Sequence, residues 1–299
     1  MKLYLAATIQ NGFCTGTVTF NKLTDLEKEV TTHLPYRLDS YHYIGTDRMV
    51  TVIRNAGLRV FLDSGAFSAF TQKTEIDINR YCDYIKANHD ILEVYSVLDA
   101  IGDAEGTWRN QQYMESQGLH PLPCFHYGEP LEALDYYVNR YPYITLGGMV
   151  PISYAQLVLW LDHLWEKHLT TSAGTPKLRV HGFGLTSKML MERYPWHSVD
   201  SSSWVQIASL GGIYLTEYGN IPVSDNSPKA KDFFSHYDNM RAHEQVAIAA
   251  LARARGFDME RLRVNHLTRK VFNMWTYIVM ARNMSQKDQR FVRTQPGLF

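Results

Sequence analysis

The chain has 299 residues, of which 45% are hydrophobic and 20% are charged, and its 30 lysines and arginines balance its 30 acidic residues. This length suits one large α/β barrel or two ordinary domains, and the composition is typical of a globular protein. No stretch approaches the roughly 18 to 20 apolar residues that span a membrane, so we expect no membrane partner. Three widely spaced cysteines, Cys14, Cys82 and Cys124, exclude a disulfide framework and a Cys-x-x-Cys metal site. They favour a reducing cytoplasm.

Short apolar runs alternate with helical patterns through the first two thirds of the chain. The first run, Met1–Ala7, is too short for a signal peptide and is typical of a first strand. We predict seven strands: Leu3–Ile9, Arg59–Asp63, Val94–Asp99, Leu122–His126, Tyr143–Gly147, Leu178–Phe183 and Ser198–Asp200. We predict helices between them at Ile76–His89, Ala104–Gln117, Glu129–Arg140 and Ser153–His168. This alternation predicts a parallel sheet, and seven strands favour a closed (β/α)8 TIM-type barrel over an open sheet. The pattern identifies no eighth strand.

The last third of the chain has a different pattern. Trp204–Val223, with Gly211-Gly212 between β-rich runs, predicts an inserted hairpin. His236–Arg255 and Met259–Met284 predict long helices. Because no linker divides the chain, we expect a single domain over residues 1–299.

The helical part from about residue 236 carries most of the excess positive charge. From Arg241 onward there are eleven basic and four acidic residues. The densest cluster is Arg253, Arg255, Arg261 and Arg263. Such a cluster either holds a nucleic-acid backbone or forms solvated helix faces, and the sequence leaves both readings open.

Three of the predicted strands run into an aspartate, at Asp63, Asp99 and Asp200. A carboxylate at the tip of a buried strand costs free energy unless it is solvated or paired. Three such residues from strands far apart in the sequence predict one polar site at the mouth of a parallel barrel, where the active sites of such enzymes lie. Further polar or glycine residues follow other strands, at His126, Gly147-Gly148 and His181. Each residue alone fits a helix cap or a turn, but the set favours a site.

Five of these strand-end segments resemble the tRNA-guanine transglycosylase superfamily, in the same order over roughly residues 60–204. The family motif Asp-Ser-Gly-Gly-Phe is similar to Asp63-Ser64-Gly65-Ala66-Phe67, and the aspartate of the next strand corresponds to Asp99. The family's Gly-Gly, its Gly-x-Gly strand and its nucleophile strand are similar to Gly147-Gly148, Gly182-Phe183-Gly184 and Asp200-Ser201.

Two departures make the chain more similar to the DNA-modifying branch of the superfamily, the DpdA-like proteins. Phe125-His126-Tyr127-Gly128 replaces the usual Gln-Gly, and no cysteine follows Asp200, so the downstream zinc site of the tRNA enzymes is absent. The resemblance implies an enzyme, a pentosyltransferase, that replaces guanine in DNA with a free 7-deazaguanine (preQ0-type) base. It implies no metal, and the absence of phosphate-binding glycine loops predicts no nucleotide or organic cofactor. The oligomeric state stays open.

The resemblance assigns roles that suit the chemistry of the residues. Asp200 is the expected nucleophile, forming a covalent glycosyl-aspartate, and Asp63 moves the protons of the leaving and incoming bases. Asp99 accepts hydrogen bonds from the N1–H and amine of a guanine-like edge. The pocket is completed by Ser64, His126, Gly147, Gly148, Met149 and His181, with Tyr127, Met149 or Trp204 offered as stacking faces.

Three alternatives stay open beside this prediction. The enzyme could act on tRNA instead of DNA, or it could be a two-carboxylate hydrolase or nucleosidase that gives the sugar to water. The chain could also be a non-catalytic nucleic-acid-binding subunit, although such a protein has no need of the nucleophile.

Overall fold

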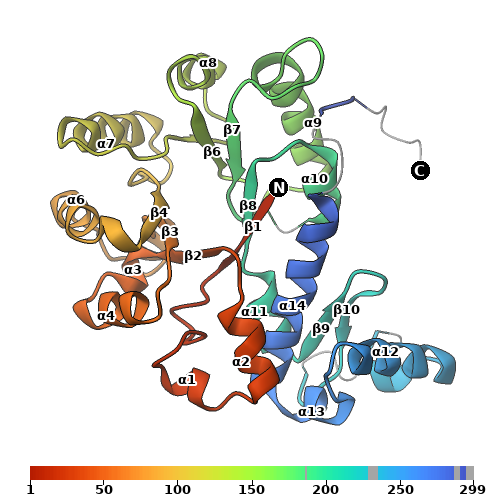
Figure 1. The fold of residues 1–299 in the computed structure, drawn as a ribbon. Coiled ribbons are helices and arrows are strands. Elements are labelled where there is room, and N and C mark those ends of the chain that lie inside the picture. Colours follow the sequence, from red (N-terminus) through yellow and green to blue (C-terminus); the bar gives the residue numbers. More distant parts are fainter. Residues whose placement is uncertain (186, 228–234, 286–289, 294–299) are drawn as a thin grey trace. The chain divides into compact units, whose positions relative to one another are not determined.

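The computed structural model describes residues 1–185, 187–227, 235–285 and 290–293. Figure 1 shows the elements of the chain coloured along the sequence. Contacts divide the chain into two compact units. The first comprises Met1–Gln10, Tyr36–Ser201 and the segment from Met284, and the second comprises Asn11–Pro35 and Ser202–Asn283. Both units combine segments that are far apart in the sequence. We predict a single domain from the sequence, and the division into two compact units does not test this prediction.

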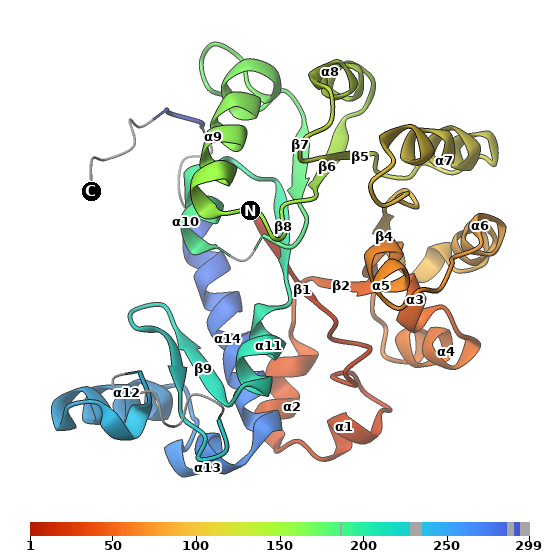
Figure 2. The ribbon, with the colours of Figure 1, turned by 180° about the vertical axis from the view of Figure 1, so that it is seen from behind.

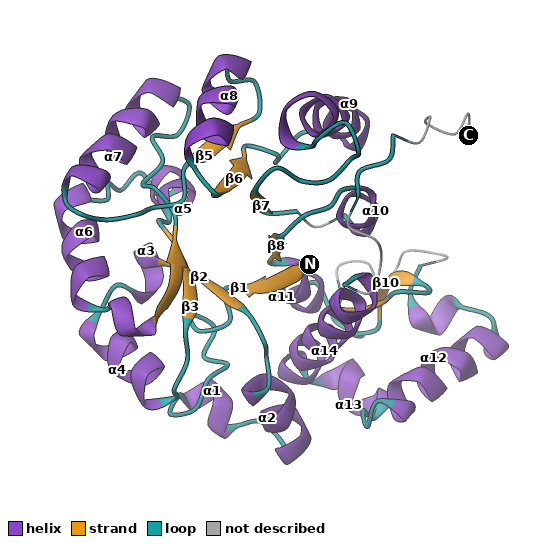
Figure 3. Cartoon of the chain, turned by 45° about the horizontal axis from the view of Figure 1, so that its top comes forward, coloured by secondary structure: helices purple, strands orange, loops and turns teal. Residues whose placement is uncertain are grey.

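The first unit holds an eight-stranded sheet in which every pair of neighbours is parallel. The strands are β1 (Lys2–Ala6), β2 (Arg37–Ser40), β3 (Val60–Asp63), β4 (Leu92–Tyr95), β5 (Cys124–His126), β6 (Tyr143–Gly147), β7 (Arg179–Gly182) and β8 (Ser198–Ser201). Their order is β4-β3-β2-β1-β8-β7-β6-β5. In Figure 3 the strands curl around a common interior, with helices outside them.

Aromatic contacts across the inner face demonstrate the curl. Phe61 of β3 lies 4.7 Å from His181 of β7 between ring centres, and Tyr4 of β1 contacts both rings. Three strands separate β3 from β7 in the sheet, so in a flat sheet they would lie roughly 19 Å apart. Side chains of Ala6, Leu38 and other inner residues complete this core.

The two end strands of the sheet, β4 and β5, meet only just beyond their own limits. A single parallel bridge joins Ser96 and Leu122. The Leu122 N–H donates to the Tyr95 carbonyl at 2.9 Å, and the Val97 N–H donates to the Leu122 carbonyl at 3.0 Å. The structure therefore confirms a curled parallel α/β sheet, but no ladder between β4 and β5 closes it within the described residues.

Helices follow most strands and pack on the outside of the sheet (Figure 3). In the first unit they are α3 (Tyr41–Ile44), α4 (Asp47–Asn55), α5 (Ala66–Thr71), α6 (Ile78–Ala87), the 3-10 turn η1 (His89–Ile91), α7 (Ala104–Ser116), α8 (Leu131–Arg140), α9 (Tyr154–Leu164), the π-helical η2 (Trp165–Leu169) and α10 (Lys188–Arg193). Local sequence explains their ends: α9 begins at a capping box in which Ser153 and Gln156 bond each other's backbone N–H.

All seven predicted strands overlap observed ones, and the four predicted helices are confirmed as α6, α7, α8 and α9. The eighth strand, which the pattern did not identify, is β2. Its four residues include Arg37 and Asp39, which remove the apolar signal although both side chains are buried. Arg37 is buried because its guanidinium donates to the Thr8 hydroxyl, and Asp39 accepts from the backbone of Ile9.

The second unit joins an N-terminal helical segment to the last third of the chain. Its elements are α1 (Val18–Asn21), α2 (Asp25–Thr32), α11 (Ser203–Ser209), β9 (Gly212–Leu215), β10 (Gly219–Pro222), the 3-10 turn η3 (Tyr237–Asn239), α12 (Ala242–Ala254), α13 (Met259–Val264) and α14 (His266–Met284). Figure 2 shows α2 beside α14, and the Thr268 hydroxyl of α14 donates to Glu27 of α2 at 2.6 Å.

Two expectations for this unit are corrected. The inserted hairpin is present as antiparallel β9 and β10, but it begins after a helix, and Gly211 follows that helix rather than forming the hairpin turn. The single helix predicted over Met259–Met284 is two helices, because the Asn265 side chain accepts from the N–H groups of Leu267 and Thr268 and starts a new helix. Residues 228–234, before this helical part, lie outside the described residues.

The cysteine and membrane expectations can be compared with the structure. All three cysteines are buried and free of disulfides, as their spacing predicts. In the described part of the chain, no helix combines the length and apolar character needed to cross a bilayer.

Candidate active site

The carboxyl ends of the eight parallel strands lie at one edge of the sheet, because all the strands run in one direction. Asp63 ends β3, His126 ends β5, Gly147 ends β6, and Asp200 lies next to the last residue of β8. Asp99 follows β4 by four residues. The predicted site residues of the first unit therefore come from separate strands to this one edge.

Asp63 lies near enough to Asp99 and Asp200 for their charges to act on its carboxyl. Burial, and after it the negative charges of Asp99 and Asp200, raise the pKa of its carboxyl to about 7. The Gly65 N–H donates to Asp63 Oδ2 at 3.1 Å, which stabilises the charged form but does not offset these effects. Ser64 is fully buried, and its N–H donates to the Ser96 hydroxyl. A carboxyl that titrates near neutral pH can both give and take a proton.

Asp200 is held by two donors on one oxygen. The Gly184 N–H lies 2.9 Å from Asp200 Oδ1, and His181 Nε2 lies 3.2 Å from the same atom. The side chain of His181 is fully buried, and that of Asp200 is 8% exposed. Both contacts fall on Oδ1, so Oδ2 is the oxygen available for attack on a substrate.

A buried chain of hydrogen bonds orients His181. Its Nδ1 lies 2.7 Å from the Ser198 hydroxyl, which lies 2.6 Å from the Tyr143 hydroxyl. With a neutral imidazole, Tyr143 donates to Ser198, Ser198 donates to Nδ1, and Nε2–H donates to Asp200. This direction keeps Asp200 an acceptor, as a carboxylate nucleophile requires.

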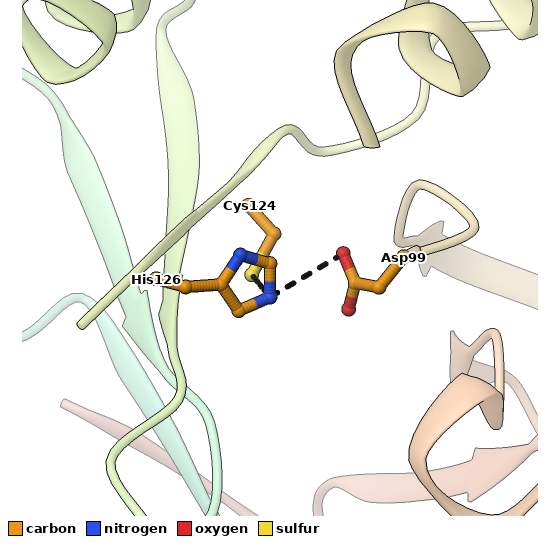
Figure 4. Close-up of side chains that lie close together, drawn as sticks. All are labelled: Asp99, Cys124 and His126. Carbon is orange, nitrogen blue, oxygen red and sulfur yellow. Dashed lines mark hydrogen bonds and ion pairs between the residues drawn. The ribbon is translucent and has the colours of Figure 1, made fainter. Parts of the chain in front are cut away.

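A second cluster of polar side chains surrounds His126 (Figure 4). Its Nε2 lies 3.4 Å from Cys124 Sγ and 3.6 Å from Asp99 Oδ1. Its Nδ1 lies 2.9 Å from Glu129 Oε1. The Asp99–Cys124–His126 cluster, named here by its three members, keeps its ligand atoms within 4.8 Å of one another. Carboxylate, thiolate and imidazole are the groups that bind zinc in proteins.

The glycines beside this cluster leave room for it. A Cβ on Gly147 would lie 2.9 Å from Cys124 Sγ and 3.0 Å from His126 Cδ2, so no other residue fits there without displacing them. Gly148 has a φ of +69°, a conformation that favours glycine.

Met149 is buried, and Tyr127 packs against the Trp160 ring. Trp204, offered above as a stacking face, lies in the second unit, fully buried against Phe13.

Several residues that contact the site residues or lie near them in the sheet are absent from the predicted site, and two of them, Tyr143 and Ser198, begin their strands. The full set is Asp39, Cys124, Glu129, Tyr143 and Ser198. Period-two spacing could have revealed two of them, because Cys124 lies two residues before His126 and Ser198 two before Asp200, on the same strand faces. Asp39 is fully buried. Burial raises the pKa of its carboxyl, hydrogen bonds from the Gln10 and Ile9 backbone lower it, and the pKa is about 6.

The four arginines proposed to hold nucleic acid lie in the second unit. Three of them contact acidic or aromatic side chains of that unit. Arg261 pairs with the buried Glu27, and Arg263 pairs with Asp225 and Asp238. The guanidinium of Arg255 lies over the rings of Phe272 and Trp275. Arg253 is exposed. A phosphate at Arg261 or Arg263 would compete with these carboxylates, so their role in binding stays a prediction.

Comparison with known proteins identifies no family for this chain. No family model matches the chain, and a search of curated proteins finds no significant match.

Proposed function

We propose that this protein exchanges guanine in a nucleic acid, DNA in preference to tRNA, for a 7-deazaguanine base through a covalent bond between Asp200 and the sugar. The observation that carries the proposal is the meeting of Asp63, Asp99 and Asp200 at one edge of the sheet, with their charges coupled at Asp63. The strand-end motifs that resemble the transglycosylase superfamily add the substrate class. The bridge between Ser96 and Leu122 supports a barrel of the TIM type, since it links the end strands.

The reaction proceeds in two displacement steps. In the first, Asp200 Oδ2 attacks C1′ of the nucleoside while the C1′–N9 bond breaks, and protonated Asp63 gives its proton to the leaving guanine. In the second, Asp63 takes the N9 proton of the incoming base, and N9 attacks C1′ and releases Asp200. Bonds formed and broken balance, so the exchange needs no external energy source. A pKa of about 7 lets Asp63 serve in both steps at neutral pH.

Asp99, Gly147 and Gly148 are the groups assigned to base recognition. Asp99 Oδ1 is a buried oxygen without a hydrogen bond among the described residues, so it can accept from the N1–H and amine of a guanine edge. Gly147 and Gly148 let the base approach the backbone closely. In a duplex the target base must first leave the stack, which requires a few kcal/mol.

Exposed aromatic side chains beside the site support a polymeric substrate. Phe67 and Phe70 of α5, which follows Asp63 directly, are 61% and 63% exposed. Val150, after Gly147 and Gly148, is 63% exposed. Aromatic faces of this kind stack on nucleic-acid bases in a way that tolerates any sequence.

The test is the exchange of radiolabelled guanine into duplex DNA, single-stranded DNA and tRNA by the wild type and by Asp200→Asn. We expect label to enter DNA with the wild type and to fall to background with Asp200→Asn, because an amide is not a nucleophile for C1′. Label in tRNA alone would move the function to the RNA branch. Release of free guanine without incorporation would indicate a hydrolase, and no reaction with any polymer would contradict the proposal.

A further inference from the structure

The Asp99–Cys124–His126 cluster has more than base recognition requires. Recognition of a guanine edge needs a carboxylate, but it gives no role to a thiol and an imidazole nitrogen turned toward the same point. Cys124 and His126 lie two residues apart on β5 and therefore present their side chains on one face of the strand. Asp99 reaches the same point from the segment after β4. Three different ligand types thus meet from one strand and one loop.

Two of the three separations between these atoms match the edges of a tetrahedral zinc site, and the ligand atoms all lie within 4.8 Å of one another. Zinc binds thiolate sulfur at about 2.3 Å and imidazole nitrogen or carboxylate oxygen at about 2.0 to 2.2 Å. Ligands at those distances on tetrahedral corners lie roughly 3.4 to 3.6 Å apart. His126 Nε2 lies 3.4 Å from Cys124 Sγ and 3.6 Å from Asp99 Oδ1. The second of these distances is that of an ion pair and is longer than a hydrogen bond.

The surroundings have the features of a metal site as well. Glu129 Oε1 lies 2.9 Å from His126 Nδ1, so a carboxylate fixes the imidazole with Nε2 toward the cluster, the usual arrangement behind a metal-bound histidine. Asp99 Oδ1 is buried and without a hydrogen bond among the described residues. Gly147 keeps clear the space beside Cys124 and His126, since a Cβ would lie within 3.3 Å of His126 Nε2.

We infer that Asp99, Cys124 and His126 bind a divalent zinc ion with one coordination position left open toward the strand-end edge. The inference goes beyond the proposed function and does not depend on it. Three protein ligands and an open position are typical of zinc sites that act on substrates rather than of closed structural sites. The open position of a bound ion would accept an oxygen or nitrogen atom of a ligand.

The experiment uses cobalt as the probe, because a thiolate bound to Co2+ gives a charge-transfer absorption in the near ultraviolet. The full-length protein is stripped with a chelator and titrated with Co2+ and, separately, with Zn2+. We expect one equivalent of ion per chain and the charge-transfer band in the wild type. Cys124→Ser should lose the band and weaken Zn2+ binding more than about tenfold. Cys82→Ser, which changes another buried cysteine on α6, should keep both and is the matched control.

Two further variants keep the test valid if Cys124→Ser does not fold. Glu129→Gln should keep the band while weakening Zn2+ binding about 10- to 100-fold, and Asp99→Asn should also weaken it. Asp200→Asn lies outside the cluster and should bind the ion normally while losing base exchange, so failure of one proposal can be told from failure of the other. The inference is overturned if the wild type binds no stoichiometric ion, or if the band persists in Cys124→Ser.

Discussion

Asp63 occupies a position in which its negative charge is unfavourable. Burial and two neighbouring aspartates, Asp99 and Asp200, raise the pKa of its carboxyl to about 7. In the unfolded chain an aspartate titrates near 3.9. The folded protein therefore holds a proton on Asp63 over a pH range in which the unfolded chain does not, and folding becomes less favourable as that proton is lost.

This leads to a prediction for Asp63→Asn. Because the folded pKa is raised, the free energy of unfolding of the wild type should fall as pH rises from about 4 to about 7. The variant should lack this fall and be more stable at neutral pH by on the order of 2 kcal/mol, after allowance for partial exposure of the group. Urea unfolding at several pH values measures it.

The control for this prediction is Asp83→Asn, which changes an exposed aspartate on α6. It should leave the pH dependence of the wild type intact. A variant Asp63→Asn whose stability falls with pH in parallel with the wild type would show that Asp63 is already charged at low pH. Asp63→Asn should also be inactive in base exchange, because its amide cannot give or take the proton that Asp63 moves.

The residues also show how far the sequence predicts the site. The positions of Asp63, Asp99 and Asp200 follow from one rule, that strand ends in a parallel sheet share an edge, and the structure brings them together. Ser198 and Tyr143 could not be assigned in that way, because their link to His181 depends on the register between β6, β7 and β8. Register between distant strands is a tertiary property that apolar patterns do not contain.

Among the helices and strands, the apolar patterns give a wrong prediction at two places where polar side chains form hydrogen bonds to the backbone or to each other. The four-residue strand β2 was missed because Arg37 and Asp39 interrupt its apolar run, and both are buried only because partners in the β1 segment bind them. The apolar spacing continues through Asn265 and predicts one helix where the structure has α13 and α14. In both places a side-chain hydrogen bond outweighs the periodicity that otherwise predicts the element.

The boundary between α13 and α14 can be tested with Asn265→Ala. Asn265 Oδ1 accepts from Leu267 N at 2.9 Å and from Thr268 N at 3.2 Å, which caps the start of α14. Removal of this cap should lower the free energy of unfolding by about 1 kcal/mol. Asn265→Asp keeps the acceptor oxygen and should lose much less. Equal losses in the two variants would mean that the cap does not stabilise the helix.

At the scale of the whole molecule, each compact unit depends on contacts between distant parts of the chain. In the second unit, Glu27 of the N-terminal segment binds Arg261 of α13 and Thr268 of α14. Burial raises the pKa of the Glu27 carboxyl, but the hydrogen bonds from Arg261, Thr268 and Thr24 outweigh it and leave the pKa lowered. The charged carboxylate thus ties residues 11–35 to residues 202–283.

Glu27→Ala should therefore destabilise the second unit. The expected loss is about 3 kcal/mol at neutral pH, the lower end for a buried pair, because Arg261 is partly exposed and can be solvated. Since the folded pKa is lowered, the contribution of Glu27 is present above the unfolded pKa and disappears as pH falls through the folded one. Denaturant unfolding of Glu27→Ala beside Glu29→Ala, an exposed neighbour on α2, measures it. Equal stability of the two variants would contradict this role.

If Asp200 is the nucleophile of a base-exchange enzyme, the covalent intermediate can be located on it. Wild type and Asp200→Asn are incubated with DNA or tRNA without a free base, quenched in acid, digested with nuclease and protease, and analysed by mass spectrometry. We expect a pentose on the peptide that contains Asp200 in the wild type and on no peptide of Asp200→Asn. Guanine released from the polymer while every peptide stays unmodified, or a pentose on Asp63 or Asp99, would contradict it.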